Sequence, residues 1–544
     1  MSVTTYEKKA SIKNGIGRMI FSLLVFMLEV IFLILLFSTL NNHAMWINAI
    51  TRVVALLLVL ILYGSNMNSS MKMPWIILVL FAPIIGVGIY LVVGLNSKPH
   101  KMRYRYTKIN EALKPLLNDE NKKIKSKNSF AHLKDKSEGL ASISNYIYRY
   151  SGYPVYSDSD ITYFSSAYDG LEAQKAAMRK AQKFIFFEYH AIEDDKAWDG
   201  IFKIMKEKAK EGVEVRVFYD DMGSIGFINT DFIDRLAKVG IECRVFNPFA
   251  PGLNLFLNNR DHRKITVIDG TVGFTGGYNI ANEYFGLTYP FGEWKDTGVK
   301  IEGPAVNSLT IAFLENWNAA VDKKSLGHQE LDVINTGNDK KLELSEEDRN
   351  KYLPEIDYVK KESRGFVQPY ADSPMDDENL GENVYIGIIN NSQKYCFIIT
   401  PYLIITDEMI HALGLAAKRG VDVRVITPGV PDKKIVYSVT RSYYNTLTRN
   451  GVHIFEWTPG FCHCKMCVSD DLVATCGTIN LDYRSFYHHF ENGCMYMDCQ
   501  AVFDTKHDFE NIIAEAEDVT TKYTGVGGIL KLRQMVLRLF AALF

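Results

Sequence analysis

The sequence predicts an α/β protein that contains two copies of one unit, preceded by an α-helical transmembrane module. Three observations predict this fold class. Long apolar stretches crowd the first hundred residues. Strand and helix patterns alternate and repeat in the remainder, which indicates a mixed sheet covered by helices. One short motif of histidine, lysine, aspartate and asparagine occurs once in each copy.

Length and composition exclude several classes of protein. The chain has 544 residues, too many for one hydrophobic core, and is expected to form about three domains. Aromatic residues make up 12% of the chain, which excludes a disordered or collagen-like protein. Its 61 basic and 63 acidic residues leave a net charge of −2, whereas a general nucleic-acid binder is usually basic. We therefore expect a folded protein with no nucleic-acid partner.

The first domain, residues 1–97, is predicted to be the transmembrane module. Its apolar stretches cover residues 19–40, 44–63 and 74–95. About 20 apolar residues in a helix span the hydrocarbon core of a bilayer, so each stretch is long enough. The first stretch is too long for a secretory signal, and no small-residue cleavage site follows it.

Basic residues indicate how this module is oriented. They lie before the first apolar stretch and again in residues 98–135, which we interpret as a basic, polar connector. The positive-inside rule places both flanks in the cytoplasm, but three full crossings would put them on opposite sides. Either one stretch is re-entrant or interfacial, or one flank breaks the rule. Because the second flank is more basic and adjoins the large domain, we place that domain in the cytoplasm.

The rest of the chain contains an internal duplication. The matching segments are 181–189 with 392–400, and 209–217 with 417–425. Each copy is predicted to form a buried strand, an amphipathic helix, a glycine turn and a second strand. The helices are expected at about residues 197–210 and 407–419, with Gly212 and Gly420 as the stop signals.

The duplication sets the remaining domain boundaries. The first half is expected to cover residues 136–325 and the second residues 365–526, joined by a solvated polar linker at 326–364. Residues 527–544 form a candidate amphipathic helix with basic residues beside its apolar face. Such a helix would bind anionic head groups at a membrane surface. Packing of this helix against the core is nearly as well supported.

One motif, present in each half, carries the candidate chemistry. Both copies follow the pattern H-x-K-x4-D-x6-G-x-x-N, at residues 262–279 and 463–480. The fixed side chains are His262, Lys264, Asp269 and Asn279, and His463, Lys465, Asp470 and Asn480. A single chance match has a probability of roughly 10⁻⁴, so two matches at equivalent places in a repeat are significant. We expect the halves to stack about a pseudo-two-fold axis that brings both motifs to one cleft.

These residue types suit chemistry on a phosphodiester. On a strand, a histidine and a lysine two positions apart point to the same face. One neutral imidazole attacks phosphorus and forms a phosphohistidine, while the other gives its proton to the leaving alkoxide. The lysines and the amides of Asn279 and Asn480 would stabilise charge on the phosphoryl oxygens. This chemistry requires no metal, and we expect no cofactor.

The carboxylates near the motifs are assigned two roles. Asp296 and Glu491 follow the two motifs at comparable distances, and we expect them to hold the histidines through Nδ1. Asp269 and Asp470 belong to the motif and are grouped with its catalytic residues. Each stands at a strand end, however, and we expect it to fix the turn rather than to touch substrate.

The cysteines are predicted to be reduced and buried. All eight follow residue 242, and most cluster late in the chain. The run from Cys462 to Cys467 lacks a second ligand pair at zinc-like spacing. We therefore favour buried thiols in a cytoplasmic domain over a metal site.

The doubled motif resembles the phospholipase D superfamily. The apolar segment 74–95 and several short segments are similar to bacterial cardiolipin synthases; these segments are 219–224, 282–284, 294–296, 303–304 and 480–485. The resemblance implies a duplicated phospholipase D-type mixed-sheet sandwich covered by helices, with His262 as nucleophile and His463 as acid/base. The chain departs from the family at Thr478, where serine is usual, and at His489, where asparagine is usual.

The resemblance also implies a membrane-bound phosphatidyltransferase. One phosphatidylglycerol would give its phosphatidyl group to histidine and release glycerol, and a second would accept it to form cardiolipin. The implied partners are phosphatidylglycerol, other anionic membrane lipids and the bilayer, and a homo-oligomer is left open. The implied location is the bacterial cytoplasmic membrane, with several crossings.

Three alternative functions are considered. Two of them would use the same motif residues, and the third would not need them. A hydrolase of the phospholipase D type would take water as the acceptor, and sequence does not show which acceptor has access. A nuclease of the superfamily would act on nucleic acid, which the near-neutral charge and the apolar module disfavour. A non-catalytic membrane scaffold would not need the intact pair of motifs.

Overall fold

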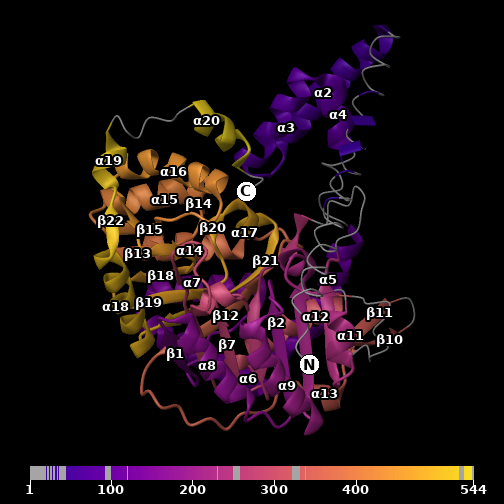
Figure 1. Cartoon of the computed structure of the whole chain (residues 1–544), viewed down its shortest axis with the longest axis vertical. Coiled ribbons are helices and arrows are strands. Elements are labelled where there is room, and N and C mark those ends of the chain that lie inside the picture. The colour runs from indigo at the N-terminus through magenta and orange to yellow at the C-terminus, as the bar shows by residue number, and fades with distance from the viewer. Residues whose placement is uncertain are drawn as a thin grey trace.

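The computed structural model describes residues 45–91, 100–118, 120–229, 231–248, 258–320, 331–336, 339–525 and 532–541, with isolated positions between 20 and 35 (Figure 1). The predicted apolar stretch 19–40 therefore lies largely outside the described residues. In Figure 1 the first half of the duplication, in magenta, lies below the second half, in orange and yellow. The N-terminal helices, in indigo, extend from the upper part of the molecule.

Three helices form the described N-terminal part: α2 (Met45–Gly64), α3 (Ser69–Phe81) and α4 (Pro83–Ile89). α2 coincides with the predicted stretch 44–63. Among the residues that the structure describes, no helix combines the length and the apolarity needed to cross a membrane.

The predicted stretch 74–95 is not one helix. α3 ends at Ala82, whose φ of −134° and ψ of 74° are not helical. Pro83 then opens α4, where its fixed φ suits the first turn and its missing N–H costs no hydrogen bond. Large apolar side chains of α2 and α3 point to solvent, as shown by Ile61 and Phe81, which are 67% and 90% exposed.

The segment predicted to be a basic connector is largely helical where the structure describes it. Residues 98–135 contribute α5 (His100–Leu113), η2 (Lys114–Asn118) and most of α6 (Glu120–Lys136), followed by α7 (Glu138–Ser151). Tyr106, Leu113 and Leu117 are buried in the main core. The few apolar side chains of this basic, polar segment recur on one helical face and pack inward, and its assignment as a connector stays a prediction.

The first half is a seven-stranded mixed sheet with the strand order β1-β9-β7-β6-β2-β3-β4. Its strands are β1 (Asp160–Phe164), β2 (Phe184–Tyr189), β3 (Glu214–Asp220), β4 (Ile241–Phe246), β6 (Lys264–Ile268), β7 (Val272–Gly276) and β9 (Gly298–Glu302). Its helices are α8 (Ala167–Met178), α9 (Lys196–Lys210), α10 (Asp221–Ser224), α11 (Phe232–Ala237), η4 (Asn282–Phe285) and α12 (Val306–Ala319).

The second half repeats this order as β12-β21-β19-β18-β13-β15-β16, with β22 added at the edge. Its strands are β12 (Phe366–Asp372), β13 (Tyr395–Ile399), β15 (Asp422–Pro428), β16 (His453–Trp457), β18 (Met466–Ser469), β19 (Val473–Gly477), β21 (His489–Met497) and β22 (Ala516–Asp518). A short pair joins β14 (Leu403–Ile404) to β20 (Leu481–Asp482). Its helices are α14 (Leu380–Asn391), α15 (Asp407–Lys418), α16 (Lys434–Arg449), α17 (Tyr483–Tyr487), α18 (Gln500–Ala514) and α19 (Thr520–Thr524).

The equal strand orders confirm the predicted duplication and the mixed sheets. In each half the first repeated strand runs parallel to the second, as β2 does to β3 and β13 to β15, and antiparallel to the motif strand. The predicted helices are α9 and α15. Gly212 and Gly420 follow them with φ of 89° and 95°, values that glycine adopts without strain.

The segment between the halves is not only a solvated linker. It contains the hairpin β10 (Leu331–Thr336) and β11 (Asp339–Leu344) and the helix α13 (Glu346–Tyr352). Tyr352 is 2% exposed, and its ring lies 5.2 Å from that of Phe184 in β2. The aromatic side chain therefore anchors the end of this segment to the first sheet.

The C-terminal helix α20 (Leu532–Leu539) lies beside α16 and reaches α3 (Figure 1). The guanidinium of Arg538 stacks 4.3 Å from the ring of Tyr443 in α16. Three residues of its predicted apolar face point to solvent, since Leu532, Val536 and Phe540 are 77%, 51% and 42% exposed. The described helix thus packs on the core through one side and leaves apolar side chains uncovered on the other.

Candidate active site

The two halves exchange short strand pairings around the motifs. β5 (Arg260–Asp261) runs parallel to the start of β21, and β17 (Gly460–Cys462) runs parallel to β8 (Glu293–Lys295). The backbone N–H of His262 then donates to Phe490 O, and that of His463 to Lys295 O, each at 2.8 Å. The segment leading to each motif histidine is therefore held by the other half of the chain.

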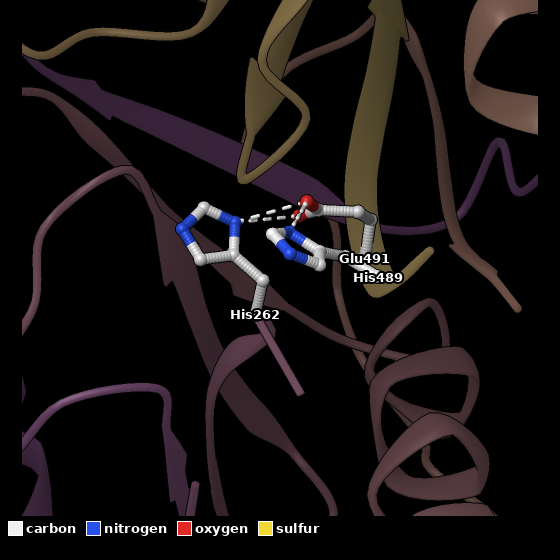
Figure 2. Close-up of side chains that lie close together, drawn as sticks. All are labelled: His262, His489 and Glu491. Atoms are coloured by element: carbon white, nitrogen blue, oxygen red, sulfur yellow. Dashed lines mark hydrogen bonds and ion pairs between the residues drawn. The ribbon is translucent and has the colours of Figure 1, made fainter. Parts of the chain in front are cut away.

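Because of this exchange, the carboxylate from each half contacts the motif histidine of the other half. His262 Nδ1 lies 2.9 Å from Glu491 Oε2, as Figure 2 shows, and His463 Nδ1 lies 2.7 Å from Asp296 Oδ2. Asp296 and Glu491, the predicted orienting residues, each contact the histidine of the opposite half, a crossing that the sequence did not predict. Their role in orienting the histidines stays a prediction. With Nδ1 held in this way, Nε2 is the nitrogen that each imidazole can turn to substrate, although Lys465 Nζ approaches that of His463 to 3.1 Å.

The two orienting carboxylates have different surroundings. Glu491 is fully buried and also accepts hydrogen bonds from the hydroxyls of Thr478 and Ser485. Asp296 accepts the backbone N–H of Thr297 at 2.8 Å. Glu491 is therefore the more firmly held of the two, because three side chains from two halves converge on it.

Both motif lysines lie within the same buried site. Lys264 and Lys465 are each 1% exposed. Lys264 Nζ donates to His262 O at 2.8 Å, and Lys465 Nζ lies 3.1 Å from His463 Nε2. After burial, the charge of Lys465 is the next cause that lowers the pKa of Lys264, so the two ammonium groups influence one another across the halves.

Burial shifts the titration of the whole group. It lowers the pKa of His262 and of His463 well below the ordinary range, and the neighbouring lysine charges act in the same direction. Burial, with the charge of Lys465, lowers the pKa of Lys264 to about 7. Burial raises the pKa of Asp296 to about 7, although Lys465 opposes this shift. These shifts favour a neutral His262, as a nucleophile requires, whereas His463 must take up the proton shared with Asp296 before it can act as an acid.

These shifts predict a narrow pH optimum near 7 for kcat/KM, which reports the free enzyme. Below about pH 7, Asp296 is protonated and no longer accepts from His463. Above about pH 7, Lys264 loses the charge that would stabilise phosphoryl oxygens. The Lys264→Arg variant should keep the acidic limb and shift the alkaline limb upward, because guanidinium does not titrate in this range. An unmoved alkaline limb would contradict the assignment to Lys264.

The motif asparagines lie at the edge of the site. Asn279 and Asn480 are 6% and 4% exposed. Asn279 Nδ2 donates to the hydroxyl of Tyr284 at 2.8 Å, and the ring of Tyr284 lies 5.3 Å from His463. Asn480 Oδ1 is buried and has no hydrogen-bond partner among the described residues. Binding of substrate phosphate by these amides stays a prediction.

Asp269 and Asp470 do not belong to the catalytic group. Asp269 accepts the backbone N–H groups of Gln182, Lys183 and Phe184 at 2.7–2.9 Å. Asp470 accepts the equivalent three in the second half, from residues 393–395. Both stand at the far end of the motif strands with φ of 53° and 57°. Their grouping with the catalytic residues is corrected, because they fix the turn and tie it to the neighbouring strand.

Replacing Asp470 with alanine is expected to lower the free energy of unfolding by about 2 kcal/mol, since three backbone donors lose a charged acceptor. The turnover number of the folded fraction should stay unchanged. Urea denaturation followed by circular dichroism, together with a turnover assay, would test this. A Lys506→Ala variant, which removes a surface partner of the adjacent Asp471, is the matched control and should cost less than 1 kcal/mol.

The aromatic neighbours of the two histidines differ. His262 has imidazoles beside it: the ring of His190 lies 5.0 Å away and that of His489 lies 5.5 Å away. His463 instead lies 5.6 Å from the indole of Trp294. In the exchanged pairings Trp294 and His489 occupy equivalent places, so the pseudo-symmetry of the site is broken here.

The sequence interpretation missed His190. It immediately follows β2, and its Nδ1 lies 2.6 Å from Asp261 O, next to the motif histidine. The signal was available, because side chains that follow the ends of parallel strands gather at one edge of a sheet. The hydroxyl of Ser485, which holds Glu491, had no such signal, since its role depends on contact between distant segments.

The thiols are as predicted. All eight cysteines are described, all are buried, and none forms a disulfide. Cys462 and Cys464, on either side of His463, are fully buried.

Comparison with known proteins agrees with this geometry. The family model described as "Cardiolipin synthase, PLD-like domain" matches residues 175–315 and again 385–513. The model "Phospholipase_D-nuclease N-terminal" matches residues 53–94. The two matches of the first model fall on the two halves of the duplication.

Several curated proteins match most of the chain. An uncharacterized protein of Streptococcus mutans is 38% identical, over 85% of this chain and 94% of its own. A cardiolipin synthase of Halalkalibacterium halodurans is 30% identical, over 83% of this chain and 84% of its own. A cardiolipin synthase of Clostridium perfringens is 33% identical, over 78% of this chain and 84% of its own.

A solved structure shares the fold. The phosphatidylserine synthase of Haemophilus influenzae covers 74% of this chain and 96% of its own, with a TM-score of 0.54 and 16% identity. At this identity the likeness shows a common architecture. The family matches, the identity to cardiolipin synthases over most of the chain and the doubled motif together show that this chain is a transferase enzyme of the cardiolipin synthase family in the phospholipase D superfamily.

Proposed function

We propose that the enzyme transfers a phosphatidyl group from one phosphatidylglycerol to another, producing cardiolipin and glycerol. One observation carries the proposal: two buried imidazoles, each held through Nδ1 by a carboxylate of the other half, share a site with two lysines. The cardiolipin synthases that match most of the chain supply the substrate class.

In the first step His262 Nε2 attacks the phosphorus of the donor lipid. His463 enters this step as the imidazolium, paired with Asp296. The bond between phosphorus and the glycerol oxygen breaks, and His463 gives its Nε2 proton to that oxygen and becomes neutral. The lysines stabilise the charge on the non-bridging oxygens. Glycerol leaves, and the phosphatidyl group stays on His262 as a phosphohistidine.

In the second step a head-group hydroxyl of the acceptor lipid attacks the phosphohistidine. His463, now neutral, accepts the hydroxyl proton, and the bond between phosphorus and His262 Nε2 breaks. Cardiolipin is released with both histidines in their starting forms. No electrons are exchanged with a cofactor, and protons balance over the two steps.

The surroundings of the histidines support this division of roles. Glu491 holds His262 while its oxygens also accept two hydroxyl hydrogen bonds, which suits a nucleophile that must keep one orientation. His463 faces Asp296, whose pKa lies near 7. A pair that exchanges its proton near neutral pH suits the acid/base role.

We also propose that the enzyme resides in the bacterial cytoplasmic membrane, with its catalytic part in the cytoplasm. Exposed apolar side chains on α2 and α3 and the basic helix α5 that follows support this placement. α20 lies beside α3 with its own apolar side chains uncovered, so both can contact one bilayer. Residence in the membrane would raise the local concentration of two lipid substrates.

The experiment that tests the function uses purified full-length enzyme and phosphatidylglycerol in detergent micelles. We expect cardiolipin and free glycerol in equal amounts, measured by mass spectrometry and an enzymatic glycerol assay. Phosphatidic acid without cardiolipin would overturn the transferase proposal and favour the hydrolase. Absence of any lipid turnover, in protein whose folding is verified by circular dichroism, would overturn both.

A further inference from the structure

A second imidazole approaches the carboxylate that holds His262. His489 Nδ1 lies 3.5 Å from Glu491 Oε1, on the same carboxylate whose other oxygen lies 2.9 Å from His262 Nδ1 (Figure 2). His489 is 11% exposed at its side chain, and its Nδ1 has no hydrogen-bond partner among the described residues. His489 and Glu491 therefore lie together on the Nδ1 side of the His262 ring (Figure 2).

These three groups have the composition of a transition-metal site. One ligand atom from each of His262, His489 and Glu491 lies within 4.8 Å of the others. In a tetrahedral zinc site with bonds of about 2.0–2.1 Å, ligand atoms lie about 3.3 Å apart. The two separations from Glu491, 2.9 Å and 3.5 Å, are therefore near the required value. The third separation, between the two imidazole nitrogens, is at most 4.8 Å, and a movement of the His489 ring toward His262 would complete the set. Two histidines and one glutamate, with water as fourth ligand, form a known zinc-binding set.

The surrounding charges select among metals. The nearby ammonium groups of Lys264 and Lys465 oppose any cation, and hard ions such as Mg²⁺ gain little from imidazole nitrogen. Zn²⁺, Co²⁺ and Cu²⁺ bind imidazole strongly enough to offset that repulsion. The chemistry of the cluster thus fits a borderline transition-metal ion and disfavours Mg²⁺ and Ca²⁺.

We propose that His262, His489 and Glu491 bind Zn²⁺ or a similar transition-metal ion, and that the bound ion inhibits the enzyme. The inhibition rests on the proposed role of His262, whereas the binding does not. A metal on Nδ1 of a neutral imidazole leaves the ring proton on Nε2. The nitrogen that attacks phosphorus then has no free lone pair, and Glu491 can no longer hold the reactive tautomer.

Binding requires one local rearrangement. Arg484 Nε donates to His489 Nε2 at 3.3 Å, which places the ring proton of His489 on Nδ1. Coordination through Nδ1 moves that proton to Nε2 and breaks this hydrogen bond. Arg484 Nη1 already donates to Asn258 Oδ1 at 3.1 Å, so the guanidinium keeps a partner after the change.

The test uses full-length enzyme in detergent after dialysis against a chelator. Titration with Co²⁺ should produce the intense visible absorption of a four-coordinate ion at one equivalent per chain. Zn²⁺ should displace Co²⁺ and reduce cardiolipin synthesis over the same concentration range. EDTA should restore cardiolipin synthesis. Mg²⁺ should neither displace Co²⁺ nor reduce synthesis. The His489→Asn variant, with the side chain usual in the family, should bind Co²⁺ and respond to Zn²⁺ at least roughly tenfold more weakly.

The controls separate this proposal from the proposed function. His507→Asn, at a histidine whose side chain is 75% exposed, should respond to Zn²⁺ as the wild type does. Equal metal responses in wild type and in both His489→Asn and His489→Gln would overturn the proposal, and so would a wild type with no Co²⁺ signal. The Co²⁺ measurement needs no turnover, so a wild type that binds Co²⁺ without making cardiolipin would contradict the proposed function alone.

Discussion

Replacing His262 with alanine is expected to reduce cardiolipin synthesis by at least about 10⁴-fold, because the variant lacks the nucleophile that we propose. The protein should still fold, since alanine removes a polar side chain from the site and leaves the strand pairing at the His262 backbone N–H in place. Intact-mass spectrometry of wild-type enzyme quenched during turnover should show a phosphatidyl adduct. The variant should show none.

His463→Ala separates the two histidines by role. With phosphatidylglycerol this variant should also lose about 10²–10⁴-fold in rate, because the leaving glycerol oxygen receives no proton. With a phosphatidyl ester of p-nitrophenol, whose leaving group needs no proton, the adduct should still form and then accumulate. His262→Ala should form no adduct with either substrate.

The opposite pattern would contradict the assignment. If His262→Ala accumulates an adduct from the activated ester and His463→Ala does not, then His463 is the nucleophile. His507→Ala, an exposed histidine in α18, serves as the control and should behave as wild type with both substrates. Full turnover by either motif variant would refute the mechanism.

The second large effect concerns the crossed carboxylates. Glu491→Gln is expected to reduce kcat by about 10³–10⁴-fold with little change in KM, because an amide N–H facing Nδ1 stabilises the wrong tautomer of His262. Asp296→Asn should act in the same way on His463. Steady-state kinetics on folded variants would measure both effects.

Each carboxylate variant should slow the reaction step that depends on the histidine of the opposite half. Glu491 belongs to the second half but serves His262, so Glu491→Gln should slow adduct formation from the activated ester. Asp296→Asn should leave that step fast and slow the second transfer. Glu293→Gln, an exposed carboxylate three residues before Asp296, is the matched control and should change kcat less than threefold. Slow adduct formation in Asp296→Asn alone would contradict the crossed arrangement.

Much of the fold was predictable from local patterns. The strands β2, β3, β13 and β15 and the helices α9 and α15 lie where apolar periodicity and glycine stop signals placed them. The break at Ala82 was not predicted, although Pro83 follows it, because an apolar stretch looks the same whether one helix or two form it. The packing of Tyr352, in the segment that joins the halves, against the first sheet was also not predicted. One aromatic residue in a highly charged segment gives no periodic apolar pattern.

The sequence by itself identified the family and the candidate catalytic residues. Each motif pair, His262 with Lys264 and His463 with Lys465, can be recognised from the sequence. Its two residues are close in the chain and point to one side of a strand. Asp269 and Asp470 could be recognised as turn residues for the same reason, since a turn is a local structure. Spacing along the chain carries this information without any knowledge of packing.

Only the tertiary structure decided how the two halves cooperate. Glu491 reaches His262, and Asp296 reaches His463, because the exchanged strand pairs bring segments more than 160 residues apart into register. The same pairing sets His489 beside one histidine and Trp294 beside the other. These contacts cannot be predicted from local sequence patterns, because the relative position of the two sheets depends on the packing of their whole surfaces.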